Sequence, residues 1–79
     1  MLPVQCKMAR VALGLGVREL AALAKVAPAT VSRFEAGEEL KERTVEAMQS
    51  ALEKAGIVFL PEDVEGPGVR LRKSLDAAE

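Results

Sequence analysis

The chain has 79 residues, and 49% of them are hydrophobic, which suits one small domain with a packed core. It contains no histidine and a single cysteine, so the usual general base, an internal disulfide and a zinc ligand set are all missing. We therefore expect no enzyme, no metal or other cofactor and no small-molecule ligand. A domain of this size often gains too little stability from its own core, which favours support from a second subunit.

The charged residues are distributed unevenly, although the net charge of the whole chain is only −1. Residues 1–37 carry five basic and two acidic side chains, a net charge of +3, whereas residues 38–79 carry six basic and ten acidic ones, a net charge of −4. This asymmetry indicates that the first half faces an anionic partner. Lys7 and Arg10 interrupt the N-terminal apolar stretch, and no stretch approaches the ~20 apolar residues of a membrane span, so we expect a cytoplasmic protein.

Apolar residues recur at helical spacing early in the chain and predict two short helices. The first is expected over residues 3–13, starting at Pro3, with Cys6 as a small, half-buried thiol. Its expected inward stripe is Val4, Met8, Val11 and Leu15. The second is expected over residues 17–24, after a break at residues 14–16. Its expected inward residues are Leu20, Ala21 and Ala24.

Two further helices are expected in the middle of the chain. The third covers residues 28–36, and Gly37 suits the left-handed position that ends it. Its expected inward residues are Val31 and Phe34, with Glu35 beside them, and its opposite face carries Ala29, Ser32, Arg33 and Ala36. The fourth is expected to be capped by Thr44 and to stop at Gly56. Its apolar stripe is Val45, Met48, Leu52 and Ala55.

The apolar period changes after residue 56. Residues 57–60 form a short β-type apolar run, and residues 69–72 alternate apolar and basic side chains, so each segment predicts a strand. The connection over residues 61–68 is longer than that of a usual hairpin. We therefore expect each strand to pair with its own copy in a second subunit. The expected dimer interface consists of Ile57, Phe59, Val69 and Leu71.

Two short helices joined by a tight turn, the second with small and basic residues outward, are the skeleton of a helix-turn-helix DNA reader. A helix in the major groove needs small side chains where its backbone approaches the DNA, and one or two long polar side chains that reach base edges. Ala29, Ser32 and Ala36 are small, and Arg33 is long and cationic. The pattern favours DNA binding, although many three-helix cores carry an outward arginine by chance.

Residues 14–37 read GLGVRELAALAKVAPATVSRFEAG. This segment resembles, without a gap, the Xre-type (phage-repressor or Cro-like) helix-turn-helix regulators, whose pattern is GLTQEELAEKAGVSRSTISRIERG. The coinciding residues include Gly14, Leu15, Glu19, Leu20, Ala21, Val26, Thr30, Ser32, Arg33, Glu35 and Gly37. The segments TVEAMQSALEKAG and IVFLPEDVEGPGVRLRK resemble a compact bacterial subgroup that ends in ALEAAGVEFI…GPGVRLR, so the resemblance covers about residues 4–73.

The resemblance implies roles for individual residues of this chain. The implied base-reading residues are Pro28, Ala29, Thr30 and Arg33, with Ser32 on the same DNA-binding face. The implied phosphate contacts are Val17 and Arg18 at the start of the second helix, and Lys41 and Arg43 before the fourth. The resemblance also implies an ion pair between Arg10 and Glu35, which we expect to hold the fold together because a partly buried carboxylate needs a partner.

Three positions depart from the family pattern and remove side-chain donors. Val17 replaces the family's glutamine, Ala27 replaces the serine that caps the third helix, and Pro28 replaces a long polar residue. Base recognition is therefore expected to depend on Arg33, on contact of a small neighbouring side chain with a thymine methyl group, and on backbone amides at the helix end. We expect one copy of the domain to bind a single DNA site with modest affinity, and we expect dimer pairing and DNA shape to supply the remaining affinity.

The expected fold is mainly α: a four-helix lambda-repressor-like helix-turn-helix domain followed by two short C-terminal β-strands. Residues 1–56 would form the DNA-binding domain, with the helix-turn-helix at about 17–36, residues 57–73 a β extension for dimerisation, and residues 74–79 a flexible tail. The expected function is transcriptional regulation by a homodimer on a palindromic operator, as a repressor of its own or mobile-element promoters. The alternative is an antitoxin-like module that captures another protein and binds DNA secondarily, which the acidic second half keeps open.

Overall fold

A computed structural model describes residues 1–72 and is mainly α-helical, as predicted, with four helices and two strands. The helices are α1 (Pro3–Ala12), α2 (Val17–Ala24), α3 (Pro28–Glu35) and α4 (Glu42–Lys54). The strands are β1 (Ile57–Leu60) and β2 (Gly68–Leu71). Lys73 and the expected flexible tail, residues 74–79, lie outside the described residues. Within residues 1–72, no helix is both long and apolar enough to cross a membrane.

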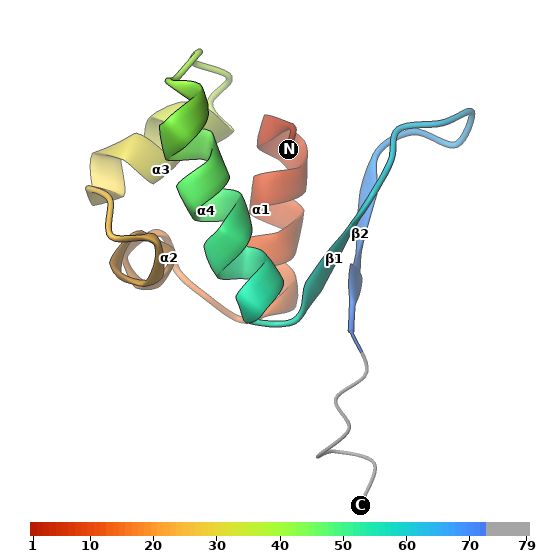
Figure 1. The fold of residues 1–79 in the computed structure, drawn as a ribbon, viewed down its shortest axis with the longest axis horizontal. Coiled ribbons are helices and arrows are strands. Elements are labelled where there is room, and N and C mark those ends of the chain that lie inside the picture. The colour runs from red at the N-terminus through yellow and green to blue at the C-terminus, as the bar shows by residue number, and fades with distance from the viewer. Residues whose placement is uncertain (73–79) are drawn as a thin grey trace, which may run out of the picture.

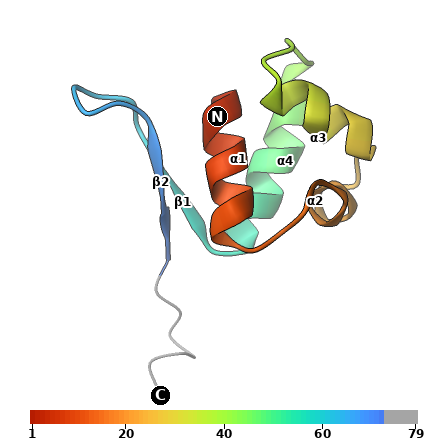
Figure 2. The ribbon, with the colours of Figure 1, turned by 180° about the vertical axis from the view of Figure 1, so that it is seen from behind.

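α1 and α4 form the middle of the domain, with α2 and α3 on one side and the two strands on the other (Figure 1). The view from behind shows the same order, with α1 in front of α4 (Figure 2). α2 packs against both α3 and α4, while β2 runs along α1. Surfaces formed by α3 and by the strands therefore point to opposite sides of the domain.

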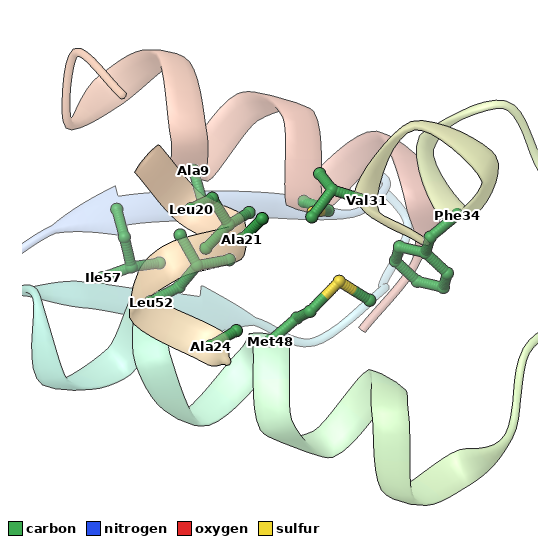
Figure 3. Close-up of a cluster of buried hydrophobic side chains, with 10 residues drawn as sticks. Ala9, Leu20, Ala21, Ala24, Val31, Phe34, Met48, Leu52 and Ile57 are labelled. Carbon is green, nitrogen blue, oxygen red and sulfur yellow. The ribbon is translucent and has the colours of Figure 1, made fainter. Parts of the chain in front are cut away.

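The core lies where the four helices meet the start of β1 (Figure 3). Its buried hydrophobic residues are Cys6, Ala9, Leu20, Ala21, Ala24, Val31, Phe34, Met48, Leu52 and Ile57. The inward residues predicted for the second and third helices are all among them and are confirmed. Four members are alanine or cysteine, and such small side chains let the helix backbones approach closely. In the stripe predicted for α4, Met48 and Leu52 are buried and Val45 is partly buried against the core, as predicted. Ala55 is exposed at the helix end, contrary to the prediction.

The side of α1 that faces the core differs from the prediction. Val4 and Val11 are 51% and 63% exposed, and Met8 is only partly buried, although all three were expected to point inward. The buried residues of α1 are instead Gln5, Cys6 and Ala9. Polar contacts of Gln5 and Arg10 fix this rotation of the helix. An apolar side of α1 is consequently left facing solvent.

Gln5 joins the start of α1 to the strands. Its side-chain oxygen accepts a hydrogen bond from the backbone N–H of Leu2 at 2.9 Å. Its Nε2 donates to the carbonyl oxygens of Leu60 at 3.1 Å and Gly68 at 3.0 Å. Gln5 is 5% exposed, so these partners replace the water that its amide would otherwise need.

α4 begins two residues earlier than Thr44, the predicted cap. Its first residue is Glu42 and its N-cap is Lys41, so the prediction that Thr44 caps the helix is wrong. The backbone N–H groups of Thr44 and Val45 both donate to the carbonyl oxygen of Lys41, at 3.0 and 3.1 Å. The negative charge of Glu42 in the first turn is favourable at a helix N-terminus, which compensates for the missing side-chain cap.

β1 and β2 pair antiparallel within one chain, with Ile57 opposite Leu71 and Phe59 opposite Val69. The two strands thus form a hairpin within the chain, and β2 spans residues 68–71 rather than 69–72. Each strand keeps one unpaired edge, and its pairing with a copy in a second subunit stays a prediction. Ile57 is 0% exposed and belongs to the core of its own chain, so it offers no surface to a partner. Phe59 and Val69 also pack against that core, whereas Leu71 is 53% exposed. Packing of one face onto the core stabilises a hairpin that would be marginal alone.

The connection between α2 and α3 contains a non-glycine residue in the left-handed conformation. Lys25 has φ 60° and ψ 44°, and the N–H of Val26 donates to the carbonyl oxygen of Ala21 at 3.0 Å. This conformation costs a residue with a Cβ about 1–2 kcal/mol, whereas glycine adopts it readily at some cost in unfolded-state entropy.

We therefore expect Lys25→Gly to raise the free energy of unfolding by roughly 0.5–1 kcal/mol, as measured by urea denaturation. Glu46→Gly, at an exposed position inside α4, is the control and should lower the same quantity by about 1 kcal/mol. A loss of stability in Lys25→Gly would show that the lysine side chain makes a larger contribution than its backbone conformation costs.

Candidate nucleic-acid interface

α3 presents an apolar face to the core and a small, polar face to solvent. Val31 is fully buried, and Phe34 is 5% exposed. The exposed residues of the opposite face are Ala29, Ser32, Arg33 and Ala36, as predicted. Pro28 is also exposed, and Thr30 is partly buried. The outward face therefore combines small side chains with one long cation, the composition that suits a helix in the major groove.

An ion pair between α1 and the end of α3 holds this helix in place. Nε and Nη2 of Arg10 donate to the two carboxylate oxygens of Glu35, each at 2.9 Å. Nη1 of Arg10 donates to the carbonyl oxygen of Leu15 at 3.1 Å. The side chains of Arg10 and Glu35 are only 13% and 9% exposed. The pair implied by the family resemblance is present, and its bidentate geometry fixes α3 relative to both α1 and the connection before α2.

Cys6 is the second partner residue of this carboxylate, and it is fully buried rather than half-buried. Its Sγ lies 3.4 Å from Oε2 of Glu35 and donates to it. Burial raises the pKa of Glu35, but hydrogen bonds from Arg10 and Cys6 outweigh this effect, and the pKa lies below its ordinary value. Burial, and then the charge of Glu35, raise the pKa of Cys6 to about 12. At neutral pH the carboxylate is therefore ionised and the thiol is protonated.

We expect Cys6 to be inert toward thiol reagents while the protein is folded. The side chain is 0% exposed, and its pKa of about 12 keeps the reactive thiolate scarce at mildly alkaline pH. Labelling with an aromatic disulfide reagent, followed by absorbance, should be slow in buffer and fast in concentrated urea. Fast labelling in buffer, at a rate that urea does not change, would contradict the burial of this thiol.

The N-terminus of α3 has no side-chain cap. Its N-cap residue is Ala27, which makes no capping hydrogen bond, and Pro28 follows without an N–H group. The N–H of Thr30 donates to the carbonyl oxygen of Ala27 at 2.9 Å. The partial positive charge of a helix N-terminus favours an anion such as a phosphate. Because Pro28 lacks an N–H group and that of Thr30 already has a partner, this end of α3 offers fewer backbone amides to a phosphate than expected.

The two residues expected to contact phosphate at the start of α2 differ in their surroundings. Arg18 is exposed, but the side chain of Val17 is partly buried and packs against the core. Oε1 of Glu19 accepts a hydrogen bond from the N–H of Gly16 at 2.7 Å. This carboxylate stabilises the start of α2 but repels a phosphate at the same place. Arg18 is therefore the cationic side chain that this end of α2 offers to DNA.

The connection between α3 and α4 carries charges of both signs. Lys41 and Arg43 are exposed at the N-cap and in the first turn of α4. Glu38, Glu39 and Glu42 are exposed in the same stretch. Neighbouring carboxylates weaken the attraction of Lys41 and Arg43 for a phosphate, so these cations contribute less than their number suggests.

Apart from Lys7 on α1 and Lys54 at the end of α4, the exposed basic side chains of the described residues form two separate groups. Those on α2, α3 and the adjoining connections are Arg18, Lys25, Arg33, Lys41 and Arg43. Arg70 and Arg72 are exposed at the end of the hairpin, on the other side of α1 and α4 from α3 (Figure 1). The hairpin arginines therefore do not extend the basic surface around α3.

Two residues whose contacts or backbone shape the fold were missed in the sequence: Gln5 beside the hairpin and Lys25 before α3. Gln5 stands three residues after Leu2, a spacing typical of a side chain that caps the start of a helix. Lys25 aligns with a glycine of the family pattern, which signals a left-handed backbone position. Both signals were visible, but each concerns backbone geometry rather than the apolar periodicity on which the predictions depended.

No model of a known protein family matches this chain, and no curated protein matches it. Within residues 1–72, no group of three or more Cys, Asp and Glu side chains is arranged to hold a metal ion. The strongest functional feature of the described residues is the outward face of α3, together with the contacts that fix its orientation.

Proposed function

We propose that this chain is a sequence-specific DNA-binding transcriptional regulator of the Xre type, and that it acts as a homodimeric repressor at its own promoter or at promoters of mobile elements. The observation that carries the proposal is the exposure of Arg33 among small residues on α3. The opposite side of this helix is fixed to the domain by burial of Val31 in the core and by the ion pair between Arg10 and Glu35. A helix held in this way offers the major groove one guanidinium and little bulk. The order and lengths of α1 to α4 support a lambda-repressor-like domain.

In this proposal, α3 lies in the major groove and contacts base edges with Arg33 and its N-terminal residues. Arg18, Lys41 and Arg43 contact phosphates, which position the domain without reading sequence. A two-fold dimer repeats the contacts about 34 Å away, one turn along the duplex, so the operator is palindromic. Occupancy of the promoter follows the concentration of the protein.

Selection of bound fragments from the source genome, together with a pool of random duplexes, tests this proposal. We expect enrichment of an inverted repeat whose half-sites lie about 10 base pairs apart. The matched control is the Arg33→Ala chain, which should enrich less strongly and with a weaker preference at one base position in each half-site. Recovery of fragments without any shared sequence would contradict specific recognition, and failure to bind DNA at low salt would exclude DNA as the partner.

A further inference from the structure

The outer side of α1 is apolar although it faces solvent. Val4 and Val11 are 51% and 63% exposed, and together with Met8 and Ala12 they line a shallow groove. Lys7 is the charged residue among the described residues that line this groove. Figure 2 views the domain from the side on which α1 lies in front of α4. A contiguous apolar surface of this kind on a small domain indicates a binding surface.

The loop between β1 and β2 has complementary properties. Val64 is fully exposed there, and its neighbours include Glu62, Asp63 and Glu65. A carboxylate oxygen of Asp63 accepts a hydrogen bond from the N–H of Glu65 at 2.8 Å, and its carbonyl oxygen accepts one from Gly66 at 2.9 Å. The loop is thus held in a turn that presents one apolar side chain beside several carboxylates.

We propose that the groove on α1 binds the β1–β2 loop of a second copy of this chain. Val64 of one copy packs among Val4, Met8 and Val11 of the other, and the loop carboxylates surround Lys7. Two-fold symmetry makes the exchange reciprocal, so each copy supplies one groove and one loop. The inference deepens the proposed function, on which it rests for the existence of a homodimer.

Charge favours the loop as the occupant of this groove over the α1 helix of a second copy. Packing one α1 directly against another would bring two Lys7 ammonium groups together, which is unfavourable at an interface. The loop instead supplies carboxylates to Lys7. Neither the groove nor the loop includes α3, so Arg33 stays free for DNA.

Sedimentation velocity of the full chain without DNA, over a range of protein concentrations and two salt concentrations, tests the inference. We expect a dimer that weakens as salt rises. Val11→Asp and Val64→Ser should each raise the dimer dissociation constant by about tenfold or more, because symmetry uses every contact twice. Leu23→Asp, at a position on α2 that is 54% exposed, is the matched control and should leave the constant unchanged.

A charge exchange identifies the partners in the contact. Lys7→Glu alone, and Glu62→Lys with Glu65→Lys, should each weaken the dimer by about tenfold, whereas the three substitutions together should restore it. Lys54→Glu, on the exposed side of α4, is the control for the charge change itself. Circular dichroism melting curves confirm that every variant is folded before its association is compared.

Three outcomes would overturn the inference. A wild-type chain that stays monomeric has no such interface, and a dimer unaffected by Val11→Asp uses another surface. A dimer weakened by the α1 variants but not by the loop variants has a different occupant in the groove. DNA binding is measured separately, so a dimer with these properties that binds no DNA would remove the proposed function and leave the interface standing.

Discussion

Arg10→Met is expected to destabilise the domain by about 3–5 kcal/mol, a large part of the total stability of a protein of this size. The substitution removes three hydrogen bonds and leaves the carboxylate of Glu35, which is 9% exposed, without its cationic partner. A buried, unpaired carboxylate is far more costly than the loss of an exposed ion pair. Urea denaturation followed by circular dichroism measures the effect, and Lys54→Met on the surface of α4 should change stability by less than about 1 kcal/mol.

The double variant Arg10→Met with Glu35→Leu separates the cost of the unpaired charge from the loss of the arginine itself. It should recover much of the lost stability, since no charge remains buried. If the double variant is no more stable than Arg10→Met within experimental error, Arg10 stabilises the domain through packing and its hydrogen bond to Leu15 instead.

The lowered pKa of Glu35 also predicts how the free energy of unfolding changes in acid. The pKa of Glu35 is lower in the folded protein than its ordinary value of 4.5, because hydrogen bonds to the ionised form outweigh its burial. Its stabilising contribution is therefore complete above about pH 4.5 and is lost as the pH falls through the folded value. Glu35→Gln should flatten the dependence of unfolding free energy on pH in that acid range, and an unchanged slope would assign it to other carboxylates.

The helix ranges and most of the core followed from apolar periodicity, but the rotation of α1 did not. The stripe of Val4, Met8 and Val11 is more apolar than the side that is buried, so a hydrophobic pattern alone selects the wrong face. The buried side is decided by Cys6, whose small thiol fits beneath α3, and by polar groups that find partners on other elements. Such partners are brought together only by the tertiary fold.

The pairing of the two strands is a second feature that apolar periodicity did not predict. Residues 57–60 and 68–71 were recognisable as strands, but their pairing within the chain depends on Gln5, which binds the carbonyl oxygens of Leu60 and Gly68 from α1. A long connection argued against a hairpin, and the packing of Ile57 into the core outweighed that argument. By contrast, the outward face of α3 was predictable because its buried residues and its exposed ones alternate with a helical period.

Arg33→Ala is expected to weaken binding to a palindromic operator by at least about tenfold. Arg33 is exposed on the side of α3 opposite Val31 and Phe34, where its guanidinium has the reach and geometry to bond O6 and N7 of one guanine. Such a contact discriminates between bases by about 1–3 kcal/mol, and a two-fold dimer makes it twice. The preference at one base position in each half-site should relax at the same time.

Lys41→Ala and Arg43→Ala should behave differently, since a phosphate contact carries no base identity. Each should weaken binding to cognate and scrambled duplexes alike and reduce the dependence of affinity on salt. The effect of each should be small, because the carboxylates of Glu38, Glu39 and Glu42 lie in the same stretch. Lys54→Ala is the matched control, because it removes an exposed cation from the far end of α4.

The measurement is a titration of wild type and the four variants against a cognate and a scrambled duplex at two salt concentrations. The ratio of the two affinities separates base recognition from phosphate contact, because phosphate contacts cancel in it. Arg33→Ala should lower this ratio, and the lysine and Arg43 variants should leave it near the wild-type value. If Arg33→Ala loses the same affinity for both duplexes, Arg33 contacts only the backbone, and base recognition falls to Ala29, Thr30 and the amides at the start of α3.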